Sequence, residues 1–493
     1  MMKVTVTLFC LESLHKSAGT RMLTPFRELQ VKFIAYTNYI VAFLTGILRD
    51  VYDKIIGQGR KPPPKGYVPI LSDFSDFFVR RFYKRINDCF ARVVTSNAGA
   101  FMDIKVGIKS DDLAQETIFT GETQRVMNLG SYNYLGFGDP DEFCTPNVKK
   151  VLAQYGSSSC SVRVDVGNTK VHKDLEVLLS EFLGTEDSIV YGMGWATNAT
   201  TIPSFVTKGD LIISDSLNHN SIITGARSSG ATIAVFKHND MENLEKILRR
   251  NIVQGQPRTH RPWGKILVIV EGIYSMEGET CPLKDVVNLK KKYPFYIWLD
   301  EAHSIGCMGN TGRGICEHEG VDPKDIDFLM GTFTKSFGAA GGYIAGSRKV
   351  INWLRLHSFG NIYADAMPAP VAQQAMGVIN VLMHNPEGQK RLKQLHENAS
   401  WFRQELKKRN YHVLGTDGSP VVPIILPPFS FFTTVTREAL KRNLGLVVVS
   451  FPAVDILEGR VRICLNSIHT KEQLQHAIDI LEECCKGIPA KIC

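Results

Sequence analysis

The segment "IDFLMGTFTKSFGAAGG" (residues 326–342) places one lysine, Lys335, directly after an apolar run and among residues with mostly small side chains. Two nucleotide-binding motifs are excluded. A phosphate-binding P-loop needs glycine immediately before its lysine, and this chain has Thr334 there. The stretch "GMGWAT" (192–197) lacks the third glycine of a dinucleotide-binding motif. Lys335 is therefore either a solvated turn residue or the holder of some other ligand, for which the small residues leave space.

The apolar run before Lys335 is the last of six that predict a parallel sheet. Strands buried on both faces are almost continuously apolar rather than alternating, because helices cover both sides of the sheet. We therefore predict an α/β large domain with a mostly parallel sheet over residues 151–365. The five upstream runs read "SIVYG" (188–192), "DLIISD" (210–215), "TIAVFKH" (232–238), "KILVIVEG" (265–272) and "FYIWLDE" (295–301).

A second pattern begins near residue 366. Helical periodicity is followed by the strand-like run "GLVVVSFP" (445–452) and by a closing helix. Thr470 with Gln473 three residues later forms a capping box that marks the start of that helix. This predicts a smaller α+β domain over residues 366–493.

Polar residues follow the predicted strands of the large domain. Asp300 and His303 lie just beyond one strand, His219 follows another, and Thr332 precedes Lys335 by three residues. Ligands of open α/β sheets bind at the carboxyl ends of the strands. A buried carboxylate needs a cation, and a protonated pyridine nitrogen with a lysine Schiff base across the ring would supply one. Each residue alone has an ordinary structural explanation, but their placement at neighbouring strand ends favours a pyridoxal phosphate site.

The N-terminal region predicts membrane association. Residues 33–48, "FIAYTNYIVAFLTGIL", are uncharged and as a helix would rise about 24 Å, against about 30 Å for a bilayer core. We expect a transmembrane helix here, with an interfacial or buried helix as the alternative. "KPPPK" (61–65) ends this membrane-associated segment, residues 1–65, as a stiff linker.

Residues 66–150 are predicted to contain an amphipathic helix and an N-terminal arm. Large apolar residues recur every fourth position beside several basic residues, so the helix would either lie on an anionic membrane surface or pack against the protein's own core. The apolar positions are Phe74, Phe78, Phe82, Ile86 and Phe90.

Composition excludes other classes. The net charge of +8 is diffuse, and no basic stripe with interleaved aromatic residues predicts nucleic-acid binding. The eleven cysteines form no CxxC pair with a partnering HxxxH, so we predict no metal site and a reduced, cytosol-facing protein.

Five segments together resemble the α-oxoamine synthases. These are pyridoxal 5′-phosphate (PLP) enzymes of the aminotransferase-like fold (fold type I) that condense an amino acid with an acyl-CoA and release carbon dioxide. The resemblance runs from about residue 66 to the C-terminus, and "GYVP" (66–69) resembles the eukaryotic membrane-bound type. The segments are "MNLGSYNYLGF" (127–137), "EGIYSMEG" (271–278), "LDEAHSIG" (299–306), "GTFTKSFGAAGG" (331–342) and "GLVVVSFPA" (445–453).

The resemblance implies a catalytic set of four residues that also contact the cofactor. Lys335 would bind PLP covalently and later remove the α-proton of the amino acid. Asp300 would keep the ring nitrogen protonated. His303 would hydrogen-bond the ring oxygen, and His219 would stack on the ring face.

Further site residues are implied in the same way. Thr332 and the helix N-terminus at Gly192, Met193 and Gly194 would hold the phosphate, and Ser275 would lie close to the ring. For the substrate, the resemblance implies that Arg462, with Arg460 as its neighbour, clamps the carboxylate. Asn133 and Tyr134 are the other predicted substrate-binding residues.

The implied reaction condenses L-serine with palmitoyl-CoA to 3-ketosphinganine, the first step of sphingolipid synthesis. The expected partner is a homologous subunit that lacks the lysine, with a homodimer as the alternative, at a lipid surface of the endoplasmic reticulum with the catalytic domain facing the cytosol. Other possibilities are a synthase that uses glycine, alanine or a different acyl-CoA, or a membrane-tethered regulatory subunit. Retention of Lys335 and Asp300 argues against the last.

Three stretches depart from the family pattern. They are "VRVDVGN" (162–168), "YADAMPAP" (363–370) and "LNSIHT" (465–470). Asp365 stands where the family has hydroxyl residues that help hold the phosphate across the subunit interface, and like charges in a dry site repel. We expect these departures to affect substrate choice and cofactor affinity.

Overall fold

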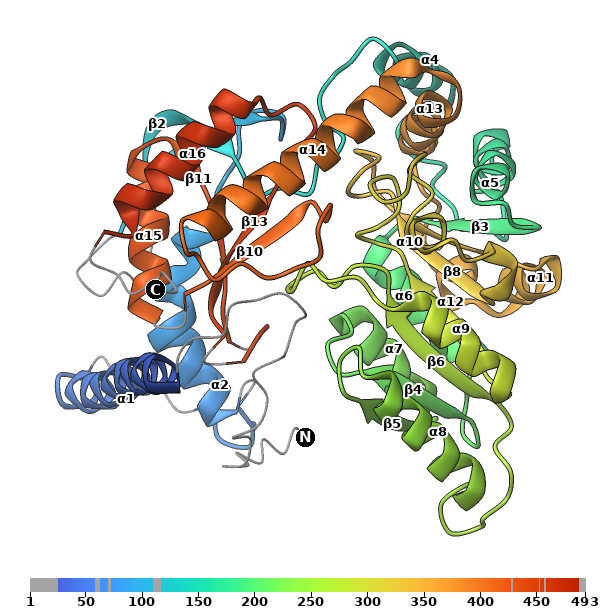
Figure 1. Cartoon of the computed structure of the whole chain (residues 1–493), viewed down its shortest axis with the longest axis horizontal. Helices are drawn as coiled ribbons and strands as arrows, with labels where there is room; N and C mark the ends of the chain where they lie inside the picture. The colour runs from blue at the N-terminus through green and yellow to red at the C-terminus, as the bar shows by residue number, and fades with distance from the viewer. Residues whose placement is uncertain are drawn as a thin grey trace.

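The computed structural model describes residues 25–57, 63–69, 72–109, 117–426, 429–451, 453–455 and 458–486. Figure 1 shows two halves: a large α/β half in green and yellow, and a smaller half in which the blue N-terminal and red C-terminal elements lie together. The site residues come from both.

The large half is built on a seven-stranded sheet with the order β3-β9-β8-β7-β6-β4-β5. Six strands are parallel and β9 alone runs antiparallel to its neighbours β3 and β8. The six apolar runs are the six parallel strands, so the predicted mostly parallel sheet is confirmed. The sequence did not predict β9. The strands are β3 (Asp187–Tyr191), β4 (Leu211–Asp215), β5 (Thr232–Phe236), β6 (Ile266–Glu271), β7 (Tyr296–Asp300), β8 (Phe328–Thr332) and β9 (Gly342–Gly346).

The strands are continuously apolar because two hydrophobic cores lie on opposite faces of the sheet. In β4, Leu211 and Ile213 belong to one core and Ile212 to the other. Each such side chain contributes roughly 1.5–3 kcal/mol when buried. Helices α6 (Gly194–Phe205), α7 (Asn220–Ser229) and α11 (Arg348–His357) cover one face. The other face packs against α5 (Lys170–Leu183), α8 (Met241–Gln254), α9 (Leu283–Lys292), α10 (Ile315–Glu319) and α13 (Ala369–His384).

The smaller half contains two three-stranded sheets. One has the order β10-β13-β12, all antiparallel; the other, β1-β2-β11, joins the chain's N-terminal arm to its C-terminal region, since Met127 pairs with Leu444. Helix α16 starts with the predicted Thr470–Gln473 capping box. The elements are β1 (Phe101–Lys109), β2 (Thr117–Asn128), β10 (Val421–Ile425), β11 (Leu444–Gly445), β12 (Val447–Val449), β13 (Arg460–Cys464), α14 (Pro386–Lys408), α15 (Phe429–Lys441) and α16 (Lys471–Cys484); α4 (Thr145–Tyr155) and α12 (Phe359–Ile362) complete the larger elements.

The N-terminal helix α1 (Pro25–Ile55) includes the predicted membrane span. Within the described residues, no helix combines the length and the hydropathy that a bilayer crossing requires, so the predicted span is not confirmed. Asn38 and Thr45 in α1, together with Arg49 and Asp50, dilute the apolar stretch too strongly.

The predicted amphipathic helix is short and interrupted. It consists of α2 (Asp73–Phe78), a π-helical turn (Val79–Tyr83), α3 (Lys84–Ile86) and a 3-10 turn (Asn87–Cys89). Phe82 and Ile86 are buried, and Arg81 is paired with Asp50 and Asp53 of α1. This part of the apolar stripe therefore packs against the protein itself, which was the alternative to membrane contact.

Candidate active site

The predicted site residues gather at the carboxyl edge of the central sheet. Glu271 ends β6 and pairs in register with Asp300 at the end of β7, which in turn lies beside Met330 in β8. Thr332 ends β8, and Lys335 follows in the loop before β9. Because these strands are parallel, their last residues and the following loops share one edge.

Asp300 is buried, and its two oxygens accept from different groups. Oδ2 accepts from Asn198 Nδ2 at 2.7 Å, and Oδ1 accepts from the Ala302 backbone N–H at 2.8 Å. Trp298 Nε1 donates to Asn198 Oδ1 at 3.1 Å, which fixes the Asn198 amide with its N–H groups toward Asp300. Within the described part of the chain Asp300 has no ion-pair partner. It is an oriented anion that lacks a matching cation.

Lys335 has the properties of a nucleophilic amine. Burial lowers the pKa of Lys335 from 10.5 to about 8, although Asp300 and Glu271 raise it; Arg462 lowers it further. Its Nζ lies 5.6 Å from the centroid of the Tyr132 ring. A sizeable neutral fraction near physiological pH is what an amine needs to attack a carbonyl group.

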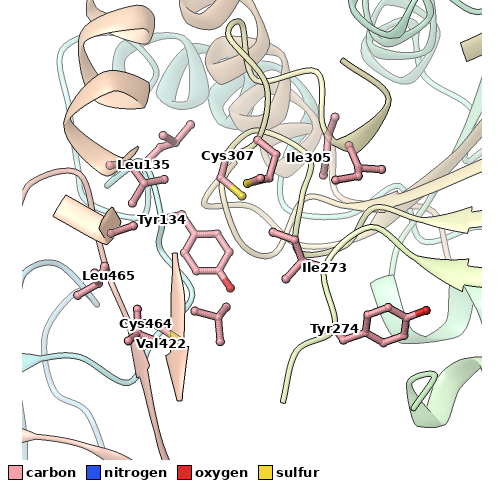
Figure 2. Packing of buried hydrophobic residues seen from close by; sticks show 14 of the residues in the cluster. Tyr134, Leu135, Ile273, Tyr274, Ile305, Cys307, Val422, Cys464 and Leu465 are labelled. Carbon is pink, nitrogen blue, oxygen red and sulfur yellow. The ribbon is translucent and has the colours of Figure 1, made fainter. Parts of the chain in front are cut away.

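His303 is held by Tyr134. Its Nδ1 lies 2.8 Å from the Tyr134 hydroxyl, which leaves Nε2 available for a ligand. Burial, with the charges of Lys335 and Arg462, lowers the pKa of His303 well below its usual value, so the imidazole is neutral. Figure 2 shows the Tyr134 ring between Cys464 of the smaller half and Cys307 of the large half. Tyr134, predicted to bind substrate, is hydrogen-bonded to His303 in the structure.

His219 is fixed from two sides. Its backbone N–H donates to Glu271 Oε1, and its Nδ1 accepts from the Ser221 backbone N–H at 3.3 Å as the N-cap of α7. Its side chain is partly solvent-exposed, but the protein around it removes enough water to lower the pKa of His219. The negative charge of Asp300 raises this pKa, and the positive charge of Lys335 lowers it. An exposed imidazole with a fixed backbone is suited to stack on a flat ring.

An anion cradle lies where α6 begins. A Cβ added to Gly194, the first residue of α6, would lie 2.5 Å from Thr332 Oγ1, so the helix N-terminus abuts Thr332 closely. Helix N-termini favour anions because their free N–H groups and macrodipole are positive. A Cβ on Gly192 would lie 3.2 Å from the Asp365 carbonyl oxygen, which places the Asp365 backbone beside the cradle in the same chain. Met193 is exposed as the N-cap.

Arg462 is a buried cation without an anion. It is 6% exposed, its guanidinium carbon lies 4.8 Å over the Tyr132 ring, and Nη1 contacts Met276 Sδ at 3.5 Å. Within the described residues its Nε has no hydrogen-bond partner and it makes no ion pair. Buried charges are normally paired, so Arg462 is prepared for an anionic ligand.

Two other predicted residues have different surroundings. Ser275 is buried in the loop that follows β6. The Asn133 amide is hydrogen-bonded to two backbone groups: Nδ2 donates to the Ala98 carbonyl, before β1, at 3.1 Å, and Oδ1 accepts from the Gly138 N–H at 2.9 Å. The structure therefore does not place the Asn133 amide as a free substrate contact.

Two residues of the site were missed from the sequence. Tyr132 faces both Lys335 and Arg462, and Asn198 orients Asp300. Tyr132 lies in the segment "MNLGSYNYLGF", which carries part of the family resemblance. The sequence alone could not show which of the neighbours Tyr132, Asn133 and Tyr134 faces the site, because that depends on the path of the backbone. Asn198 gave no signal, since it lies in a helix far from Asp300 in sequence.

The donor set fits pyridoxal phosphate. An amine with a lowered pKa, an oriented carboxylate without a cation, a neutral histidine and a helix N-terminus beside a threonine match the aldehyde, ring nitrogen, ring oxygen and phosphate of that cofactor. The uncommitted Arg462 adds a place for a carboxylate. Within the described residues, no group of three or more histidine, cysteine, aspartate or glutamate side chains could hold a metal ion.

Comparisons with known proteins agree with this arrangement. Residues 124–481 match the family described as aminotransferase class I and II. The chain is 49% identical over 449 residues to long chain base biosynthesis protein 2d of Oryza sativa subsp. japonica, covering 90% of this chain and 92% of that one. It is 42% identical to human serine palmitoyltransferase 3, covering 92% and 84%.

A solved structure described as a high-resolution structure of SPT with PLP internal aldimine superposes with a TM-score of 0.74. The sequence identity is 28%, and the match covers 85% of this chain and 99% of that one.

Proposed function

The chain belongs to the aminotransferase class I and II family, and we propose that within it the chain is the PLP-binding catalytic subunit of a serine palmitoyltransferase, an α-oxoamine synthase. The reaction joins L-serine to palmitoyl-CoA, releases coenzyme A and carbon dioxide, and yields 3-ketosphinganine. One observation carries the proposal: a lysine with a pKa of about 8 and a carboxylate without an ion-pair partner lie at one sheet edge, and an arginine without an anion faces the same Tyr132 ring as that lysine.

When bound, PLP supplies an electron-withdrawing ring that stabilises negative charge on the α-carbon of the amino acid. We assign the proton transfers to this chain's residues. Lys335 Nζ would hold the cofactor and would accept the α-proton of the amino acid. Asp300, held by Asn198 and the Ala302 N–H, keeps a proton on the ring nitrogen. His303 Nε2 would hold the ring oxygen, and His219 would cover the ring face.

Arg462 would select the substrate's carboxylate. Its buried guanidinium gains an ion pair only when an anion binds beside it. Binding of an amino acid would therefore offset the free-energy cost of burying this positive charge. The Tyr132 ring beneath it limits where the guanidinium can lie. A fixed carboxylate matters because the bond that breaks must stand perpendicular to the cofactor ring. Ser275, in the loop after β6, is the further residue proposed to lie near the ring.

A second chain would complete the site. Exposed apolar side chains lie near the anion cradle at Thr332 and the N-terminus of α6: Val166 is 79%, Tyr363 75% and Met193 60% exposed. The backbones of Val162 and Asp365 pair beside them. We propose that a homologous, lysine-lacking subunit covers this surface, with a second copy of this chain as the alternative.

Helix α1 would rest on a lipid surface of the endoplasmic reticulum, with the large half in the cytosol. One face of α1 is fixed to the protein: Asp53 pairs with Arg81, and Asn38 accepts from Ser430 at 2.8 Å. The opposite face exposes apolar residues from Phe33 to Ile55, about 33 Å of helix. A helix with this division lies in the membrane interface.

The full chain, co-expressed with a lysine-lacking homologue and loaded with PLP, should convert L-serine and palmitoyl-CoA to 3-ketosphinganine, detected by mass spectrometry. Lys335→Ala should abolish product. A wild-type complex that turns over glycine or alanine and leaves serine unused would refute the serine assignment. A complex that is inactive with every amino acid, with or without Lys335, would refute an enzymatic function.

A further inference from the structure

Two arginines of strand β13 face the site loop but are engaged very differently. Arg460 and Arg462 are separated by one residue, so their side chains leave the strand on the same side. Arg462 has an uncommitted Nε, as described above. Arg460 is 1% exposed and every nitrogen of its guanidinium is occupied. Only one of the two can therefore bind a substrate.

The partners of Arg460 lie in two places. Nε donates to the Glu458 carbonyl at 2.8 Å and Nη2 contacts the Glu458 carboxylate at 3.0 Å. Nη1 reaches across to the large half, where it donates to the Met276 carbonyl at 2.9 Å and to Glu277 Oε1 at 3.1 Å. Arg460 thus connects strand β13 to the loop that follows β6.

That loop touches Arg462 through Met276. The Met276 carbonyl is held by Arg460, and its Sδ lies 3.5 Å from Nη1 of Arg462. The position of the Met276 peptide therefore limits where the neighbouring guanidinium can lie. The same loop carries Ser275.

The loop has other attachments, including a largely buried contact of His238 Nε2 with Glu279 Oε2 at 3.4 Å. The Thr416 N–H donates to the Gly278 carbonyl at 3.1 Å, and Asn239 Nδ2 donates to the Thr280 carbonyl at 3.0 Å. Glu277 is buried, and burial raises the pKa of its carboxyl while Arg460 lowers it. Loss of Arg460 would remove the hydrogen-bonded cation from a buried carboxylate and leave only the more distant charge of His238, so we expect the loop to shift.

We propose that Arg460 is a positioning residue: by clasping the Met276–Glu277 segment it sets the place of the Arg462 guanidinium. Arg460 itself does not touch the substrate. The inference rests on the proposed function only for the identity of the ligand, an α-amino acid whose carboxylate Arg462 receives.

The test uses the PLP-loaded complex of the full chain with its partner. Arg460→Ala should raise the KM for L-serine about tenfold or more, since a hydrogen bond to a charged group is lost and the clamp is displaced. The KM for palmitoyl-CoA should change by less than about twofold. Arg460→Lys, which can still donate to the Met276 carbonyl, should recover part of the loss. Arg442→Ala, at an exposed arginine paired with Glu438, is the matched control and should change neither KM.

A second variant keeps the proposal testable if Arg460→Ala does not fold. Glu277→Gln retains the size of the side chain but removes the charge, and it should raise the KM for serine several-fold. The variant with both Arg460→Ala and Glu277→Gln should have the same KM for serine as Arg460→Ala alone, because both changes release the same loop.

The proposal is overturned if Arg460→Ala, or Glu277→Gln where the former is insoluble, lowers the melting temperature but leaves the KM for serine unchanged, or raises both KM values equally. Titration of the cofactor absorbance with serine, glycine and alanine separates this from failure of the proposed function. If serine is not the substrate, weaker binding of whichever amino acid perturbs the spectrum still supports the role of Arg460. Unchanged binding of all three refutes it.

Discussion

Replacement of Lys335 by methionine should stabilise the cofactor-free protein while abolishing its activity. Burial lowers the pKa of Lys335 to about 8, against 10.5 for an unperturbed lysine. At pH 7 the ammonium group of Lys335 therefore binds its proton much more tightly in the unfolded chain than in the folded chain. The folded state therefore carries a cost of about 3 kcal/mol, since each pKa unit corresponds to about 1.4 kcal/mol. Methionine has similar length and no charge, so it removes that cost.

The pH dependence gives the sign of the effect. Because the folded pKa is lowered, the cost is fully present below about pH 8 and is relieved as pH rises toward 10.5. The stability difference between Lys335→Met and wild type should therefore fall from about 3 kcal/mol at pH 7 to about 1 kcal/mol at pH 10.

Thermal unfolding of the cofactor-free proteins at the two pH values measures this difference. Lys349→Met, at an exposed lysine, controls for the loss of one positive charge. A variant that is less stable than wild type at pH 7, or a difference that grows toward pH 10, would refute the assigned environment of Lys335.

Three further substitutions test separate parts of the site. Arg462→Lys should raise the KM for serine by about ten- to a hundredfold, measured by steady-state kinetics, because a bidentate cation becomes a single donor; an unchanged KM would contradict the clamp. Asn198→Leu removes a donor to Asp300 and should weaken PLP binding about tenfold in equilibrium titrations, with no loss contradicting its role. Gly194→Ala adds a Cβ that would lie 2.5 Å from Thr332 Oγ1, so it should also weaken PLP binding, and wild-type affinity would contradict the cradle.

The sequence predicted the strands well because their burial is simple. Residues such as Leu211, Ile212 and Ile213 are apolar in succession since both faces of β4 are covered, and that composition is visible without the fold. It also placed Asp300 and Lys335 at strand ends, which parallel pairing then brought to one edge. Strand β9, "GYIAG", was missed because two glycines and its short length weaken the signal.

Side-chain roles were harder to predict because they depend on the backbone path. Asn133 and Tyr134 were predicted as substrate contacts; in the structure the Asn133 amide donates to the Ala98 carbonyl and the Tyr134 hydroxyl bonds His303. Their neighbour Tyr132 instead faces the two cations of the site. The N-terminal helix was also hard to interpret without the backbone path. Its uncharged stretch predicted a transmembrane helix, whereas one part of α1 contacts Arg81 and the rest of the protein.

Peptide mapping would show directly whether Lys335 carries the cofactor. The protein purified with PLP is reduced with borohydride, which fixes the cofactor to the lysine that holds it, and is then digested and analysed by mass spectrometry. We expect a pyridoxyl group on the peptide that contains Lys335 and its absence from the Lys335→Ala protein. A pyridoxyl group confined to another lysine, or absent from PLP-loaded wild-type protein, would show that Lys335 does not hold the cofactor.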